Sequence, residues 1–186
     1  MSSVLERYKK IQSDISSQNT DSVLPTKIIA VSKTFSLDHI KPLIDFGHNH
    51  FGENKVQEAE HKWKNIKKNN KNLKLHMLGR LQTNKVKKAI SVFDYIHSVD
   101  SKKLAETLKK NENEQSKKLS YFIQVNFAEE KQKSGISALD AISFYKYCNN
   151  IKLNIIGIMC FPPFGVDPTN FFKQAFELNK KIGLKE

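Results

Sequence analysis

The sequence predicts an α/β fold in which helices cover a parallel sheet. Short apolar runs of strand type alternate with segments of helical period, at about 20–30 residues per unit. Such alternation is typical of parallel strands joined by helical crossovers. A doubly wound sheet and a TIM-type barrel both fit the pattern. A Rossmann nucleotide site does not, because no GxGxxG follows a strand, and a GxxxxGKS/T motif is also missing.

Six segments are expected to be strands, and they are residues 27–31, 49–52, 73–78, 95–99, 119–125 and 153–160. Four sets of apolar residues at helical spacing mark crossovers between or after them: Val56, Ala59, Trp63 and Ile66; Val86, Ala89, Ile90 and Phe93; Leu139, Ile142 and Tyr145; Phe172, Ala175 and Phe176. We expect each set to face the core. A further helix over residues 1–20 precedes the first strand.

Helix ends carry recognisable signals. Ser36 and Ser101 suit N-cap positions, Pro168 suits a first helical position, and Gly47 suits a helix C-terminus. Six βα units follow from this reading, within one domain over residues 1–186. Because a closed TIM-type barrel needs eight strands, the sequence predicts either an open sheet or a barrel that lacks two strands.

Composition excludes several classes of protein. No apolar run approaches the ~20 residues of a membrane span, and the N-terminal segment has no apolar core of the kind that secretory signals carry. The two cysteines, Cys148 and Cys160, are expected to be thiols in a reducing cytoplasm. No cysteine–histidine or carboxylate cluster indicates a metal site.

The charge balance raises the question of a nucleic-acid partner. Lysine and arginine total 31 against 19 acidic residues, for a net charge of +12. All but two of these cations, Arg7 and Arg80, are lysines spread along the whole chain. Arginine makes the better forked contacts to phosphates and bases, so nucleic-acid binding is not the expected main function.

Chemistry is expected where the strands end, because parallel α/β folds bind ligands at that edge. Lys33 follows the first strand directly, where partial desolvation would lower its pKa and favour attack on an aldehyde. Alternatively, Lys33 is a strand-end lysine with its amine in water. His76 either polarises a ligand or packs in the sheet, and Glu53 either acts as a base or pairs with a lysine.

Five ordered blocks at these strand ends resemble one known family. They are KIIAVSKT (27–34), FGENKVQE (51–58), HMLGRLQTNK (76–85), IQVN (123–126) with KSGI (133–136), and IGIMCFPP (156–163). The sequence resembles the pyridoxal 5′-phosphate homeostasis proteins, over residues 1–186.

The resemblance implies a single TIM-type barrel like the N-terminal domain of alanine racemase. It places the cofactor's Schiff base on Lys33 and a cofactor-side role on Asn54, with His76 and Met159 as weaker candidates. It implies a monomeric pyridoxal 5′-phosphate carrier in cofactor homeostasis, without robust catalysis, since the second domain that completes the alanine racemase site is not seen. A weak racemase-like enzyme and a lysine-rich nucleic-acid binder remain the alternatives.

The sequence also departs from the family pattern. Family members continue with a segment of the type SxGMSxD and a final VRIG strand, which supply the last two strands and most of the phosphate contacts. Neither motif is found here. We therefore expect an incomplete barrel with weakened cofactor affinity.

Overall fold

The structure, a computed structural model, describes residues 3–18, 26–130 and 134–184. Within them it contains six strands in one sheet, all parallel and in the sequential order β1-β2-β3-β4-β5-β6, together with seven α-helices. The sequential order excludes a doubly wound sheet, in which the strand order reverses. The predicted α/β barrel-type arrangement of about six βα units is confirmed.

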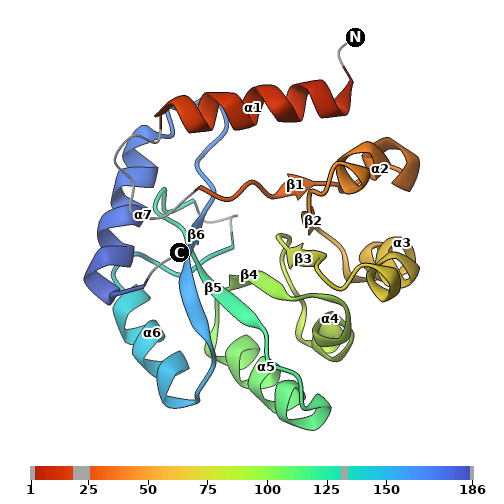
Figure 1. Cartoon of the computed structure of the whole chain (residues 1–186). Coiled ribbons are helices and arrows are strands. Elements are labelled where there is room, and N and C mark those ends of the chain that lie inside the picture. Colours follow the sequence, from red (N-terminus) through yellow and green to blue (C-terminus); the bar gives the residue numbers. More distant parts are fainter. Residues whose placement is uncertain (1–2, 19–25, 131–133, 185–186) are drawn as a thin grey trace.

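The strands are β1 (Ala30–Val31), β2 (His50–Glu53), β3 (Lys74–Met77), β4 (Tyr95–Val99), β5 (Ser120–Val125) and β6 (Ile155–Cys160). The helices are α1 (Val4–Gln18), α2 (Leu37–Asp45), α3 (Val56–Asn69), α4 (Val86–Val92), α5 (Lys102–Gln115), α6 (Ala141–Asn150) and α7 (Thr169–Ile182). A single 3-10 turn, Thr83–Lys85, leads into α4. Figure 1 shows the strands curving around the middle of the molecule and the helices lying outside them.

The core lies between the sheet and the helices. Phe51 on β2 packs against Trp63 on α3 with ring centroids 4.8 Å apart, and both side chains are fully buried. The predicted α4 stripe is buried at all four positions, Val86, Ala89, Ile90 and Phe93. Helical spacing thus identifies the packed faces of α3 and α4 correctly, because one apolar stripe per helix is what a single covering layer requires.

Two predicted stripes agree with the packing only in part. Ile142 and Tyr145 do lie on α6, and Tyr145 packs against the core. The buried residues of α6 are Ala141, Phe144 and Cys148, whereas Leu139 precedes the helix and is 90% exposed. The helix begins late because Ser137 and Asp140 hydrogen-bond to each other and shape its entry. On α7 no residue is buried, and Phe172 and Phe176 are largely exposed.

Smaller differences concern the ends of elements. The first strand is shorter than predicted, since residues 27 and 28 extend past the start of β2, its one neighbour in the sheet. Ser101 caps α5 by accepting a hydrogen bond from Leu104 N, but Ser36 makes no such bond. Pro168 occupies the N-cap of α7 instead of its first helical position. Gly47 ends α2 at φ +93° as predicted.

Candidate functional site at the carboxyl-terminal edge of the sheet

Lys33 lies two residues beyond β1, in a turn at the carboxyl-terminal edge of the sheet. Its side chain is exposed, so the partial desolvation that we expected there is not found. Within the described residues, its amine has no hydrogen bond or ion pair. The next residue, Thr34, has φ +67°, a value that non-glycine residues rarely adopt. The turn thus presents a primary amine that no neighbouring side chain occupies.

The residue before Lys33 is held firmly. Buried Ser32 donates from its backbone to Gly52 O at 2.9 Å and from its hydroxyl to Glu53 Oε1 at 2.8 Å. Its own carbonyl accepts a hydrogen bond from Lys62 Nζ at 2.7 Å. Because Ser32 is fixed on three sides, the point at which the Lys33 side chain leaves the sheet is fixed as well.

Glu53, which is fully buried, organises this support. Its Oε1 accepts hydrogen bonds from Lys62 Nζ at 2.8 Å and Trp63 Nε1 at 3.0 Å, in addition to the Ser32 hydroxyl. Lys62 is the ion-pair partner, and its side chain is 14% exposed. Of the two interpretations of Glu53, the lysine pair is therefore the one observed. The network lies on the α3 side of β2, where Glu53 braces the sheet.

Asn54 follows β2 directly and is half-buried. Its backbone lies against Gly79 in the loop after β3, where an added Cβ would meet Asn54 Cα at 3.0 Å. Gly52 has a similar constraint, because a Cβ there would lie 2.5 Å from Leu78 Cδ1. The two glycines let the ends of β2 and β3 approach closely, which brings Asn54 beside the residues that follow β3.

A cavity of about 340 Å³ opens at this edge, beyond the ends of β3, β5 and β6. Its apolar wall consists of Leu78, Val125, Met159 and Phe161, and its polar wall of Arg80, Gln124, Asn126 and Ser134. We call it the mouth cavity. Met159, predicted as a weaker cofactor contact, is thus placed at the carboxyl-terminal edge with access to a ligand.

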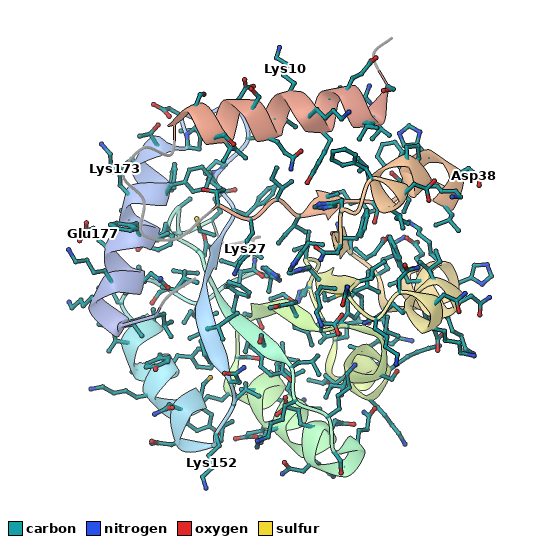
Figure 2. All side chains as sticks on the ribbon, in the orientation of Figure 1. Lys10, Lys27, Asp38, Lys152, Lys173 and Glu177 are labelled. Atoms are coloured by element: carbon teal, nitrogen blue, oxygen red, sulfur yellow. The ribbon has the colours of Figure 1, made fainter. Side chains whose placement is uncertain are left out.

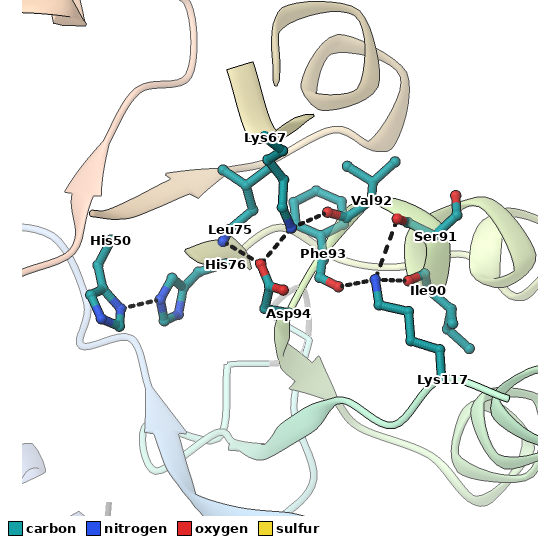
Figure 3. A network of polar contacts seen from close by, with 10 residues as sticks. All are labelled: His50, Lys67, Leu75, His76, Ile90, Ser91, Val92, Phe93, Asp94 and Lys117. Atoms are coloured by element: carbon teal, nitrogen blue, oxygen red, sulfur yellow. Dashed lines mark hydrogen bonds and ion pairs between the residues drawn. The ribbon is translucent and has the colours of Figure 1, made fainter. Parts of the chain in front are cut away.

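His76 lies deeper, inside the curve of the sheet. Its Nε2 is 2.9 Å from His50 Nδ1 and its Nδ1 is 2.9 Å from His97 Nε2, so neighbouring strands β2, β3 and β4 carry a hydrogen-bonded histidine chain. Figure 3 shows the contact between His50 and His76. Tyr95 stacks on His76 with centroids 4.3 Å apart. Both ring nitrogens of His76 are therefore engaged by other side chains.

Burial keeps the His76 and His97 rings uncharged. Desolvation lowers the pKa of His76 to about 2, with the charges of His97 and His50 acting in the same direction. Desolvation also lowers the pKa of His97 to about 4. Neither ring is protonated near neutrality.

The histidines border a second, inner cavity of about 730 Å³, which also reaches Met159, Cys160 and the α7 residues Phe172 and Ala175. Lys27 lines it too. Figure 2 shows Lys27 toward the middle of the molecule, whereas Lys10 and Lys173 project outward from the periphery. Met159 borders both cavities and thus separates the mouth from the interior.

Several other kinds of site are not seen in the parts of the chain that the structure covers. No three metal-ligating side chains are arranged to hold an ion among the described residues. None of the described helices combines the length and apolarity needed to cross a bilayer. Cys148 and Cys160 are both free thiols, and burial raises the pKa of Cys148 to about 12.

Asp100 is a polar residue at the carboxyl-terminal edge of the sheet that the sequence analysis did not single out. It follows β4 directly and is half-buried. Burial raises its pKa, while the charge of Arg80 and hydrogen bonds from Ser101 and the Gly135 backbone pull it down. A search for polar residues directly after each strand would have found Asp100, since Val99 ends β4.

Comparison with known proteins agrees with this architecture. The profile of the alanine racemase N-terminal domain family matches residues 7–182. An alanine racemase from Clostridium difficile superposes with a TM-score of 0.71 over 97% of this chain and 49% of that protein, at 14% identity, which shows a shared fold. The chain is thus an alanine racemase N-terminal-type barrel domain in class.

More similar relatives define the family within that class. A pyridoxal phosphate homeostasis protein from Haemophilus influenzae is 31% identical over 164 residues, which cover 84% of this chain and 68% of that protein. The counterpart from Pasteurella multocida is 35% identical over 137 residues, covering 73% and 59% respectively. PipY from Synechococcus elongatus, solved without pyridoxal phosphate, superposes with a TM-score of 0.84 at 31% identity, over 95% of this chain and 80% of PipY. This chain belongs to the pyridoxal phosphate homeostasis protein family.

The match spans little more than half of the Pasteurella relative and about two thirds of the Haemophilus one. A second PipY structure, with pyridoxal phosphate bound, superposes with a TM-score of 0.80.

Proposed function

We propose that this chain binds pyridoxal 5′-phosphate and serves in homeostasis of that cofactor, holding its aldehyde on Lys33. The observation that carries the proposal is the exposed, unpartnered Lys33 amine at the carboxyl-terminal edge of the sheet, in a chain whose relative PipY has been solved with pyridoxal phosphate bound. When bound, the cofactor supplies an aldehyde, which condenses reversibly with a primary amine to a Schiff base and releases water.

The residues around Lys33 fit such a ligand. Ser32 is fixed from three sides and thereby sets the origin of the lysine side chain. Asn54 is half-buried at the same edge and offers an amide beside the turn, and Met159 offers an apolar contact at the mouth cavity. His76 would contribute by packing beneath the site, because both of its ring nitrogens already have partners.

The same geometry favours a carrier over a robust enzyme. Proton transfer on both faces of an amino-acid Cα needs an acid and a base with pKa values near the working pH. His76 and His97 have strongly lowered pKa values and lie inside the sheet. Glu53 is committed to Lys62 and Trp63. Among the described residues, Lys33 is then the main candidate for proton transfer.

Reductive trapping tests the proposal. The purified chain is incubated with pyridoxal 5′-phosphate, reduced with borohydride and mapped by peptide mass spectrometry. Lys33 should carry the label more often than any other lysine, and Lys33→Ala should remove the visible absorbance of the complex. Lys10→Ala is the matched control, since Lys10 is exposed on α1 and projects outward (Figure 2). Equal labelling of many lysines would refute a special role for Lys33.

The racemase alternative predicts a different result. Solvent deuterium would enter the Cα position of an amino acid in the presence of cofactor, and Lys33→Ala would abolish that exchange. A carrier shows no such exchange above the rate of free pyridoxal 5′-phosphate.

Three further expectations remain proposals. A reducing cytoplasm is supported by the two free thiols. A monomer is the expected oligomeric state, which sedimentation would measure. Nucleic-acid binding, if present, would weaken steeply with salt and would not depend on Lys33.

A further inference from the structure

Arg80 is the one cation among the described residues that line the mouth cavity, and the proposed function gives it no role. It follows β3 in the loop that Gly79 presses against Asn54, and its side chain is exposed. The cavity of about 340 Å³ is at the small end of the range for ligand pockets, which begins at roughly 300 Å³. A small molecule is therefore the kind of ligand that this space admits.

The N–H donors of the Arg80 guanidinium are available to a ligand. Within the described residues it makes no hydrogen bond and no ion pair. The carboxylate whose pKa it influences, Asp100, is hydrogen-bonded by Ser101 and by the Gly135 backbone. Arg80 and Asp100 thus interact through charge, without the forked pairing that would occupy the guanidinium.

The rest of the polar wall offers acceptors. Gln124 Nε2 donates to Ser134 O at 3.0 Å, and Asn126 Nδ2 donates to Glu130 O at 2.9 Å. These two bonds anchor the backbone of Glu130 and Ser134 beside the end of β5 and use the amide nitrogens. The amide oxygens of Gln124 and Asn126 receive no hydrogen bond from the described residues. The remaining lining residues include Leu78, Val125 and Met159, which are apolar.

We propose that the mouth cavity binds a small apolar carboxylic acid, whose carboxylate pairs with the Arg80 guanidinium. A planar fork of N–H donors matches the two oxygens of a carboxylate, and the apolar wall accommodates a short hydrocarbon side chain. An α-amino acid and a 2-oxo acid share this chemistry. The amide oxygens on the polar wall favour the amino acid, because its ammonium group donates hydrogen bonds. The mouth cavity shares Met159 with the proposed cofactor site, and the inference goes beyond the proposed function by giving Arg80 a ligand whose binding is tested without cofactor.

The test uses the whole chain without added cofactor, with binding measured by calorimetry or by ligand-observed NMR. The probes are L-leucine, 4-methyl-2-oxopentanoate and the uncharged 4-methylpentanamide. We expect L-leucine to bind more tightly than 4-methyl-2-oxopentanoate, and the amide not to bind. Arg80→Gln should weaken binding of the acid at least about ten-fold, as the loss of charge-assisted hydrogen bonds implies. Arg80→Lys, which keeps the charge and loses the fork, should give an intermediate affinity.

Arg7→Gln is the matched control, because it removes the same charge from α1, outside the cavity lining. It should leave acid binding unchanged. Equal binding of acid and amide, or an Arg80→Gln chain that binds the acid as well as the parent, would overturn the proposal. So would inorganic phosphate that binds more tightly than either acid and is lost in Arg80→Gln, since Arg80 would then serve a phosphate group. Lys33 labelling is read separately, so the two proposals can fail independently.

Discussion

Gly79 and Asn54 are in such close contact that a Cβ atom on residue 79 would lie 2.4 Å from the Asn54 carbonyl oxygen. A non-bonded carbon and oxygen do not approach to 2.4 Å, so the loop after β3 must move if residue 79 gains a side chain. The contact joins Asn54, the predicted cofactor residue directly after β2, to the loop that carries Arg80.

Gly79→Ala should therefore disturb the site as well as the fold. We expect a loss of about 1–3 kcal/mol in the free energy of unfolding, as for other overpacked positions, and reduced borohydride trapping at Lys33. Urea unfolding and peptide mapping measure the two effects. Gly47→Ala is the control, since its Cβ would meet nothing within 4 Å and its cost is the strain of φ +93° at the other edge of the sheet. Undiminished trapping in Gly79→Ala would contradict the argument.

Glu53→Gln tests the buried network under Ser32. The amide keeps the shape of the side chain but leaves Lys62 without its counter-ion, so we expect a loss of about 3 kcal/mol in the free energy of unfolding. Glu58→Gln is the comparison, because Glu58 pairs with Lys55 at the surface, where both side chains are largely exposed. An exposed pair contributes under about 1 kcal/mol. Equal losses in the two variants would show that burial of the Glu53 pair has no consequence.

The histidine chain predicts how stability depends on pH. The folded-state pKa values of His76 and His97 lie below the ordinary value of 6.5, so the unfolded chain binds more protons as the pH falls. The contribution of these rings is fully present above pH 6.5 and is lost progressively as the pH falls, toward about pH 4 for His97 and about pH 2 for His76. Replacing His97 by Gln should flatten the pH dependence of urea unfolding between pH 6.5 and 4.

The control for that experiment is His61→Gln, because His61 is exposed on α3. His61→Gln should leave the pH dependence of the free energy of unfolding unchanged. The histidine argument fails if His97→Gln and the parent chain lose stability equally on acidification.

Lys117 is expected to stabilise the end of α4. Its Nζ donates to the carbonyl oxygens of Ile90, Ser91 and Phe93, the last at 3.0 Å, which satisfies acceptors that a helix C-terminus leaves open (Figure 3). Lys117→Met should lower the free energy of unfolding by about 1–2 kcal/mol, which thermal or urea unfolding would measure. Its neighbour Lys118 is exposed, and Lys118→Met should cost almost nothing. Similar losses at both positions would argue against a capping role.

The sequence predicted the strands well because each combines a short apolar run with a crossover of helical period on either side. It also predicted which strand ends meet, since the carboxyl ends of parallel strands share one edge; Lys33, Asn54 and Met159 all lie there. The start of α6 was missed because Leu139 fits the helical spacing, although the Ser137–Asp140 contact delays the helix.

The polar networks could not be predicted in the same way. The histidine chain depends on the strand register, in which Gly52 lies beside His76 and His76 beside Tyr95, and a shift of one residue would turn the rings to opposite faces. Likewise, nothing in the sequence distinguishes Lys62 from the many other lysines as the partner of Glu53. The packing of α3 on β2 is what brings Lys62 to Glu53.

The histidine chain has one more consequence, which concerns where its protons reside. A neutral imidazole carries one N–H, so each of the two ring-to-ring bonds needs a donor on one side and a bare nitrogen on the other. His76 Nε2 is bonded to His50 Nδ1, and His76 Nδ1 is bonded to His97 Nε2. With all three rings neutral, both bonds can be made only if all three are protonated on Nδ1 or all three on Nε2. The tautomers of His50, His76 and His97 are therefore coupled, and the three rings on β2, β3 and β4 behave as a single two-state unit inside the sheet.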